Sequence, residues 1–234
     1  MHKKGISLVI PAYNEEDRIL DTAEAYYKYL SRNFTKYELI IACNNCSDNT
    51  PKIAENFCRG KKAVFLNFPY YTGKGGAVIE GFRKAKNELA AFVDADNSTT
   101  PEEFDKLVRN ADNCKVIIAS RALSSSILKT KQPFPRRFLG MCFRSLVNIL
   151  FSLNIKDTQC GAKIFPKKAL AAVLPTLKSS GFAFDVEILW KLKKKGFSIL
   201  EVPIAWNDSG RSSVSFSDPF KMFSSIIALR FSKS

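Results

Sequence analysis

Short apolar runs alternate with helical patterns along the first half of the chain. The runs cover residues 6–11, 38–42, 63–66, 89–93 and 116–119, and the segments between them carry the acidic first turns and spacing of helices. Strands that are apolar throughout are buried on both faces, as in a parallel sheet covered by helices on each side. The alternation therefore predicts a doubly wound α/β fold with a mostly parallel sheet, whose ligands bind where the strands end.

The charge of the chain is concentrated in its second half. Residues 1–114 hold 16 Lys and Arg and 16 Asp and Glu, whereas residues 115–234 hold 20 and 6 and so carry the whole net charge of +14. This asymmetry indicates an anionic partner for the second half, such as a phosphate, a nucleic acid or an acidic membrane face, with solubility alone as the alternative explanation. Phenylalanines occur mainly at helical spacing rather than interleaved on a basic sheet face, so we expect no nucleic-acid partner.

The second half also has a different organisation. Residues 124–137 are polar, basic and rich in proline, which predicts a loop, and residues 157–163 read as a turn-rich link followed by helices. A strand is predicted at 198–202, a loop at 208–217 and a last helix at 219–231.

No uncharged apolar run reaches about 18 residues, so no membrane span is expected. The six cysteines are expected to be free thiols in a reducing cytosol.

Residues 138–155 form an apolar helical pattern with a narrow polar stripe. Arg144, Asn148 and Ser152 recur every four residues, and the rest of the surface is apolar. Such a helix lies either in a membrane interface with its apolar side down or in the core against the sheet. The sequence leaves both arrangements open.

Asp94 and Asp96 follow a predicted buried strand with one residue between them. Hard divalent cations prefer carboxylate oxygens, and Mg²⁺ commonly takes one or two carboxylates together with a substrate diphosphate. The pair therefore predicts a site for Mg²⁺ or Mn²⁺ with a diphosphate, with a solvated turn or helix cap as the alternative. Gly73-Lys74-Gly75-Gly76 precedes a helix and predicts either close backbone approach to a phosphate or a strained turn.

These motifs occur in an order that resembles the family 2 inverting glycosyltransferases of the GT-A fold. Residues 9–16, 73–78 and 94–96 carry this resemblance. In the second half, residues 119–121, 136–137, 157–165, 182–187 and 201–206 are similar to polyprenyl-phosphate sugar synthases. Within that group, Asp157-Thr158-Gln159-Cys160-Gly161 is closer to the dolichyl-phosphate glucose synthases than to the mannose enzymes. The resemblance covers nearly the whole chain.

The resemblance implies an activity and a layout. It implies metal-dependent transfer of a hexose, glucose from UDP-glucose, to polyprenyl or dolichyl phosphate with inversion. GDP-mannose as donor, or a soluble transferase acting on a glycan or protein, are the alternatives. Within a single GT-A domain, residues 1–121 would bind the nucleotide sugar, and residues 122–234 would bind the acceptor through a basic loop and amphipathic membrane-facing helices. The protein would attach peripherally to the cytoplasmic face of a membrane.

The resemblance also implies roles for individual residues. Asp94 and Asp96 would hold the metal. The nucleotide sugar would meet Pro11, Ala12, Tyr13, Glu15, Asn44, Lys74, Gly75, Asp94, Ala95, Asp96 and Arg211. The acceptor phosphate would meet Arg121, Arg136 and Arg137. Asp157, Gln159 and Asp185 would complete the catalytic set with Asp94 and Asp96, positioning sugar hydroxyls, arginines or metal.

Overall fold

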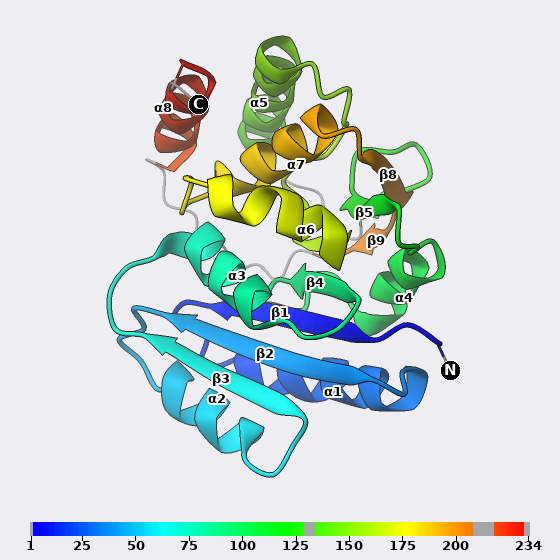
Figure 1. The fold of residues 1–234 in the computed structure, drawn as a ribbon. Coiled ribbons are helices and arrows are strands. Elements are labelled where there is room, and N and C mark those ends of the chain that lie inside the picture. The colour runs from blue at the N-terminus through cyan, green and yellow to red at the C-terminus, as the bar shows by residue number, and fades with distance from the viewer. Residues whose placement is uncertain (1, 129–133, 208–217, 232–234) are drawn as a thin grey trace.

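In the described part of the chain, seven strands form one sheet in the computed structural model, with helices on both faces (Figure 1). The structure describes residues 2–128, 134–207 and 218–231, without the side chains of residues 134–137 and 218–221. The elements are β1 (Ile6–Ala12), α1 (Ile19–Asn33), β2 (Tyr37–Asn44), α2 (Thr50–Cys58), β3 (Ala63–Phe68), α3 (Gly73–Lys84), β4 (Leu89–Val93), α4 (Pro101–Arg109), β5 (Lys115–Ser120), β6 (Ile127–Leu128), α5 (Phe134–Phe151), β7 (Ala162–Pro166), α6 (Lys167–Val173), η1 (Leu174–Thr176), α7 (Phe184–Lys194), β8 (Ser198–Pro203), β9 (Ala205–Trp206) and α8 (Asp218–Phe231).

The sheet has the strand order β3-β2-β1-β4-β7-β5-β8. Strands β1 to β4 run parallel to one another and β5 runs parallel to β8, whereas β7 runs antiparallel to both of its neighbours, β4 and β5. This confirms the predicted mostly parallel sheet flanked by helices. The carboxyl ends of β1, β2 and β4 therefore meet along one edge of the sheet.

Strand β7 corrects the prediction of a link followed by helices after residue 157. Its sequence is Ala-Lys-Ile-Phe-Pro, and Lys163 interrupts the apolar run. The strand is nevertheless fully buried, because Lys163 pairs with Asp185 inside the protein. The loop predicted at 124–137 is also wrong in part, since β6 pairs with β9 there and α5 begins at Phe134.

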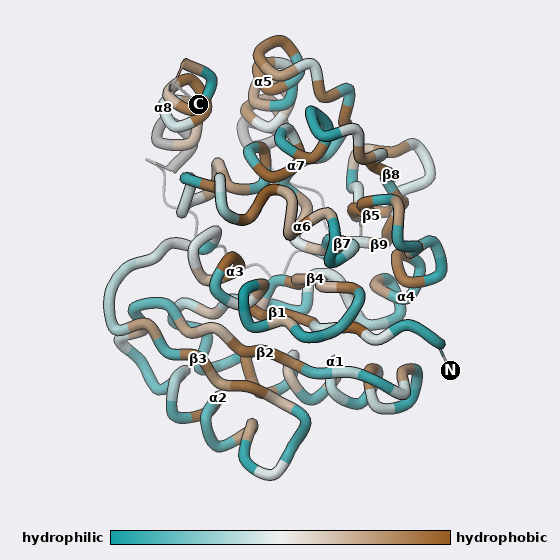
Figure 2. The backbone as a smooth tube through the Cα atoms, in the orientation of Figure 1, coloured by the Kyte–Doolittle hydropathy of each residue, from teal (hydrophilic) through white to brown (hydrophobic). Residues whose placement is uncertain are grey.

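Each face of the sheet has its own hydrophobic core. Side chains alternate along a strand, so Leu8 and Ile10 pack with α1, α2 and α4, whereas Val9 packs on the opposite face with α3, α5, α6, α7 and α8. Figure 2 shows β1 and β2 as largely hydrophobic segments. Burial on both faces explains why these strands are continuous apolar runs in the sequence.

Helix α5 begins and ends about one turn earlier than the predicted range of 138–155. Left-handed backbone at Ser152 (φ 51°) and Asn154 (φ 53°) follows the last helical residue. One side of the helix is buried in the core through Phe143, Val147 and Phe151. The helix therefore contributes to the core, one of the two arrangements that the sequence left open.

The other side of α5 is apolar and exposed. Phe138, Leu139, Met141 and Ile149 lie on it, and Ile149 is 77% exposed. Helix α8 lies beside α5 (Figure 1), where the rings of Phe143 and Phe223 are 5.7 Å apart. The backbone carbonyl of Leu150 accepts a hydrogen bond from Arg230 Nε at 2.9 Å, and Ile227 and Phe231 of α8 are also exposed.

None of the helices in the described ranges has both the length and the hydropathy needed to cross a membrane. In the structure all six cysteines are free thiols, two of them, Cys43 and Cys160, buried.

Candidate active site

The loops that follow β1 and β2 are tied together at the carboxyl edge of the sheet. Asn14 has left-handed backbone (φ 53°), and its side chain donates to Ser47 Oγ at 3.1 Å and accepts from the Ser47 N–H at 2.8 Å. The Glu15 N–H donates to Thr50 Oγ1 at 2.7 Å. Four of the residues predicted to meet the donor lie on this edge: Pro11, Ala12 and Tyr13 from β1 and its loop, and Asn44 from β2.

Asn44 also fixes the start of α3. Its side chain is buried, and its Oδ1 accepts hydrogen bonds from the N–H and the hydroxyl of Thr72 at 2.7 and 2.8 Å. Thr72 is the residue before α3. Asn44 therefore orients the helix that carries Lys74.

The glycines at the start of α3 are needed for packing against the loop before α7. A β-carbon on Gly73 would lie 2.3 Å from the Ser180 carbonyl oxygen, and one on Gly75 would lie 2.4 Å from the β-carbon of Phe184. The Gly76 N–H donates to the same Ser180 oxygen at 3.0 Å. The structure thus explains the small residues by contact within the protein, whereas the predicted donor contact of Gly75 stays a prediction.

Asp94 lies between Lys74 and the backbone of residue 161. Its N–H donates to the Gly161 carbonyl at 3.0 Å, and its Oδ1 is 2.6 Å from Lys74 Nζ. Asp96 turns back on its own loop and accepts a hydrogen bond from the Ser98 N–H at 2.9 Å. Ala95, between the two carboxylates, is buried, and its carbonyl accepts from the Thr22 hydroxyl at 2.7 Å.

Glu15 adds a third carboxyl group to this region. Burial raises the pKa of Glu15 to about 6, against the opposing effect of Arg18, and the charges of Asp96 and Asp94 raise it further. Arg18 Nε donates to Glu15 at 2.7 Å. Glu15 therefore lies within the electrostatic field of Asp94 and Asp96. Its predicted contact with the donor stays a prediction.

The carboxylates at this edge fit a hard divalent cation that binds together with a diphosphate. Asp94 and Asp96 present oxygen ligands, and Gly161 leaves the space that the Asp94 carboxylate occupies. Across residues 2–128, 134–207 and 218–231, no three His, Cys, Asp or Glu side chains gather as a metal site. Mg²⁺ commonly takes one or two carboxylates and fills its remaining positions with substrate oxygens or water, so the pair Asp94 and Asp96 is compatible with this cation, and its metal role stays a prediction.

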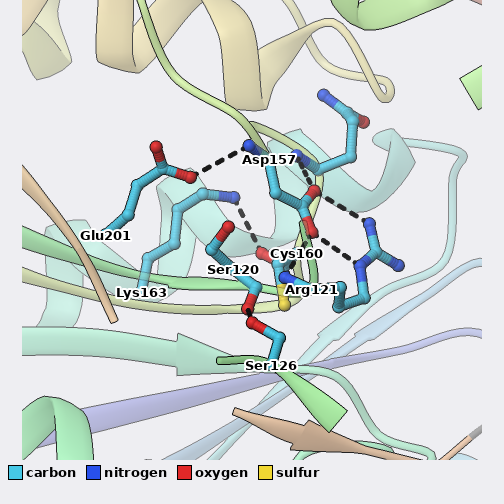
Figure 3. A network of polar contacts seen from close by, with 8 residues as sticks. Ser120, Arg121, Ser126, Asp157, Cys160, Lys163 and Glu201 are labelled. Carbon is cyan, nitrogen blue, oxygen red and sulfur yellow. Dashed lines mark hydrogen bonds and ion pairs between the residues drawn. The ribbon is translucent and has the colours of Figure 1, made fainter. Parts of the chain in front are cut away.

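Arg121 and Asp157 form a second polar centre, at the end of β5 (Figure 3). Arg121 Nε and Nη2 donate to the two Asp157 oxygens at 2.7 and 3.0 Å, and the Arg121 N–H donates to Oδ2 at 2.9 Å. Burial alone would raise the pKa of Asp157, but the Arg121 guanidinium outweighs it and holds the pKa below its usual range. Asp157 thus positions an arginine, one of the roles predicted for it.

Glu201 supports this pair from β8. One carboxylate oxygen accepts a hydrogen bond from the Lys156 N–H at 2.9 Å. The other accepts from the Asp157 N–H at 3.0 Å (Figure 3). The guanidinium of Arg121 also lies over the ring of Trp206, 5.3 Å from its centroid. Glu201 had no individual role in the sequence analysis, because its motif gave no indication of the backbone groups that it would meet.

Asp185 forms an ion pair in the protein interior. Its carboxylate contacts Lys163 Nζ, and the side chains are 2% and 0% exposed. Lys163 also donates to the Cys160 carbonyl at 3.0 Å. In the structure the partner of Asp185 is a buried lysine, and the pair lies against the backbone next to Gly161. The catalytic role of Asp185 stays a prediction. Sequence reasoning missed Lys163 because it missed β7.

Several buried polar atoms near these two centres have no hydrogen-bond partner in the described structure. They are Asn97 Oδ1, Ser98 Oγ, Ser120 Oγ, Thr158 Oγ1 and Gln159 Nε2. Gln159 was predicted to position sugar hydroxyls, and its unpaired amide nitrogen is available for that contact. Such groups are usually satisfied by a ligand or by water.

The side chains of three arginines that were predicted to bind phosphates lie outside the described residues. Arg136 and Arg137 lie in the first turn of α5, and their side chains are outside the described residues. Arg211 lies entirely outside them. Their predicted contacts with the acceptor phosphate and the donor diphosphate stay predictions.

Comparison with known proteins gives one family over most of the chain. The model of glycosyl transferase family 2 matches residues 7–174. A dolichyl-phosphate beta-glucosyltransferase of Trichomonas vaginalis is 32% identical over an alignment of 228 positions that covers 92% of this chain and 68% of that protein. The dolichyl-phosphate beta-glucosyltransferase of Saccharomyces cerevisiae is 30% identical over an alignment of 249 positions, gaps included, that covers 96% of this chain and 74% of that protein.

Solved structures share the fold. Glucosyl-3-phosphoglycerate synthase from Mycobacterium tuberculosis, in complex with Mn²⁺, UDP and phosphoglyceric acid, superposes with a TM-score of 0.72 at 17% identity. The match covers 99% of this chain and 80% of that one.

Proposed function

Because this chain belongs to glycosyl transferase family 2, we propose that it transfers glucose from UDP-glucose to dolichyl phosphate or a similar polyprenyl phosphate, with inversion. The products are a β-linked lipid-phosphate glucose and UDP. The observation that carries the proposal is the similarity to dolichyl-phosphate beta-glucosyltransferases over 92% and 96% of the chain. The GT-A-like fold, with two carboxylates at the carboxyl edge of the sheet, agrees with it.

The donor would bind at the edge formed by β1, β2 and β4. Asp94 and Asp96 would hold Mg²⁺ or Mn²⁺ there, and the bound cation would neutralise the negative charge that develops on the departing diphosphate. Lys74 lies beside Asp94 and brings a positive charge within reach of the same phosphates. Pro11, Ala12, Tyr13 and Glu15 would line the base and ribose pocket, as the resemblance implies.

The acceptor needs little activation from the protein. A phosphate monoester has a second pKa of about 6, so the lipid phosphate is mostly ionised at pH 7 and is already a nucleophile. The protein then has to align this phosphate with the anomeric carbon and stabilise the leaving group. Arg121, oriented by Asp157, supplies a fixed cation at the end of β5 for this purpose.

The two halves of the chain would divide the substrates between them. We assign the donor to residues 1–121 and the acceptor to residues 122–234, within one domain. The whole excess of positive charge in residues 115–234 supports this division, because the acceptor phosphate lies at an anionic membrane surface. Strand β7, from the second half, lies between β4 and β5 and joins the halves in one sheet.

We further propose peripheral attachment to the cytoplasmic face of a membrane through α5 and α8. The exposed apolar residues Phe138, Leu139, Met141 and Ile149 of α5 lie on the helix that α8 flanks, and α8 adds Ile227 and Phe231. An amphipathic surface of this kind binds the interface of a bilayer, and nearby Lys and Arg strengthen the binding to anionic lipids.

A transfer assay tests the proposed activity. Purified protein is given labelled UDP-glucose or GDP-mannose, with and without dolichyl phosphate, in Mg²⁺, Mn²⁺ or EDTA. We expect label in lipid only from UDP-glucose, only with dolichyl phosphate and only with a divalent cation. Label from GDP-mannose instead would change the donor, and label that does not depend on lipid would replace the acceptor with a glycan or protein.

Asp96→Asn provides the matched inactive control for the assay. It keeps the size of the side chain and its hydrogen bond from Ser98, while it removes a charge that the cation requires. Full activity of this variant in Mg²⁺ would contradict the metal role of Asp96.

A further inference from the structure

Lys74 is paired with one of the two carboxylates proposed to hold the metal. Its Nζ lies 2.6 Å from Asp94 Oδ1, and its side chain is only 22% exposed. The start of α3 is fixed by the contact of Gly75 with Phe184 and by the hydrogen bonds from Thr72 to Asn44. The backbone of Lys74 is therefore held in place, and its Nζ also lies over the ring of Phe92, 5.6 Å from the centroid.

The Lys74 ammonium lies in a field of several carboxylates. Burial alone would lower the pKa of Lys74, but Asp94, Asp185 and Asp96 outweigh burial and raise it. The charge of Asp185 is already balanced by Lys163. The Lys74 charge is therefore available to balance Asp94, with which it makes its direct contact.

A divalent cation bound to Asp94 would lie next to this ammonium group. Like charges a few ångströms apart repel, and the repulsion is stronger in a partly buried site than in water. Lys74 would also lose its contact with Asp94. A diphosphate that arrives with the cation reverses both penalties, because its oxygens neutralise the cation and give Lys74 a new anionic partner.

We propose that Lys74 is a resident counter-ion of Asp94, which makes the site bind a divalent cation and a nucleotide diphosphate together rather than the cation alone. The inference deepens the proposed function, because the diphosphate is that of the sugar-nucleotide donor. Lys74 acts here as a positioning residue. It couples the two binding events, and by thermodynamic reciprocity each ligand strengthens the other by the same factor.

Direct titration with Mn²⁺ tests this coupling without any turnover. Free Mn²⁺ is measured by electron paramagnetic resonance for the wild-type protein, with and without saturating UDP, and the ratio of the two dissociation constants gives the coupling factor. Lys74→Met removes the charge and keeps the length of the side chain. Lys74→Arg keeps the charge, and Lys84→Met, on the last turn of the same helix, removes an exposed lysine away from the site.

We expect Lys74→Met to bind Mn²⁺ alone about tenfold more tightly than wild type and to show a coupling factor about tenfold smaller. Lys74→Arg should retain most of the coupling, and Lys84→Met should match wild type. Unchanged or weaker binding of Mn²⁺ alone by a folded Lys74→Met protein, as judged by circular dichroism, would overturn the counter-ion role. If wild type binds no Mn²⁺ even with UDP, the metal site of the proposed function is refuted together with the counter-ion role. If wild type binds Mn²⁺ with UDP but Lys74→Met shows no change, only the counter-ion role is refuted.

Discussion

A β-carbon on Gly161 would lie 1.8 Å from Oδ2 of Asp94, so the Asp94 carboxylate lies directly against the backbone of residue 161. The same glycine carbonyl accepts the Asp94 N–H. The loop before β7 therefore determines where the first carboxylate of the proposed metal site can lie. This contact joins the end of β4 to a segment almost seventy residues later in the chain.

Gly161→Ala should impair the site and leave the fold intact. The new methyl group displaces only the end of a flexible side chain, so we expect a change in unfolding free energy below about 1 kcal/mol. A displacement of the carboxylate by about 1 Å should lower the transfer rate about 100-fold. Urea unfolding and the transfer assay check the two effects.

Gly75→Ala is the matched contrast, because its β-carbon would meet the β-carbon of Phe184 and the Gly181 carbonyl. We expect it to destabilise the protein by about 1–3 kcal/mol through overpacking. Equal loss of stability in both variants would contradict the distinction between them.

Asp157→Asn should release Arg121. The amide cannot balance the guanidinium charge, and removing one partner of a buried pair destabilises a protein by about 3–5 kcal/mol. We expect the KM for dolichyl phosphate to rise about tenfold, and kcat to fall, while the affinity for UDP with Mn²⁺ stays within about threefold of wild type. Initial-rate kinetics with each substrate varied in turn give the comparison. A rise confined to the KM of UDP-glucose would contradict the assignment of Arg121 to the acceptor phosphate.

Glu15 should make stability fall as the pH rises. Its pKa is raised from 4.5 to about 6 in the folded protein, so the folded state binds the proton more tightly. The resulting stabilisation is fully present below pH 4.5 and is lost as the pH rises through 6, and it amounts to about 1–2 kcal/mol. Glu15→Gln should lack this pH-dependent stabilisation. Urea unfolding at pH 4 and 7 in EDTA measures the difference between variant and wild type, and a parallel pH dependence of the two proteins would refute the effect.

Breaking the ion pair of Lys163 and Asp185 should destabilise the protein strongly, whereas replacing both residues by apolar ones should destabilise it little. Asp185→Asn leaves a fully buried ammonium without its counter-charge, so we expect a loss of about 3–5 kcal/mol. The double variant Lys163→Met with Asp185→Leu should recover most of that loss, because apolar side chains fill the same volume. Denaturant unfolding of the single and double variants tests it. A double variant as unstable as Asp185→Asn would mean that the hydrogen bond from Lys163 to the Cys160 carbonyl matters more than the charge.

Membrane binding should depend on the exposed apolar side of α5. Ile149→Glu removes a 77% exposed apolar side chain, and we expect it to weaken binding to vesicles containing phosphatidylserine about tenfold. Leu20→Glu on α1 changes an exposed apolar residue under the opposite face of the sheet and should bind as wild type does. Co-sedimentation with vesicles measures both, and equal binding by all three proteins would exclude α5 as the contact surface.

The parallel part of the fold could be predicted because its strands are apolar throughout. The same reasoning located Asp94 and Asp96, since both follow such a strand directly. Strand β7 could not be found in this way, because Lys163 stands in its middle and becomes acceptable only through Asp185, which lies 22 residues later. Local patterns carry no information about such a distant partner.

The sequence predicted which residue types make up the site, but not which residues they contact. Motif resemblance indicated Asp157 and Arg121, yet their hydrogen bonds to each other depend on how the end of β5 meets the loop before β7. The glycines at 73 and 75 invited a phosphate-binding interpretation, whereas the structure requires them for contact with residues 180–184. The end of α5 was misplaced because left-handed backbone at Ser152 is rare for a serine and has no sequence signal.

The position of β7 in the sheet also has a consequence for how the protein is made. Strand β5 pairs only with β7 and β8, which both follow it in the chain, and β4 lacks its second neighbour until β7 emerges. On the ribosome, strands β1 to β4 can assemble early, but the β4 edge of that nascent sheet stays open while about seventy further residues are translated. At roughly 5–20 residues per second, this takes several seconds. During that interval the open edge of β4 is exposed to pairing with other chains. The long sequence separation between the Asp94 loop and the residue 161 loop thus sets the period in which protection of the nascent chain by a chaperone has most effect.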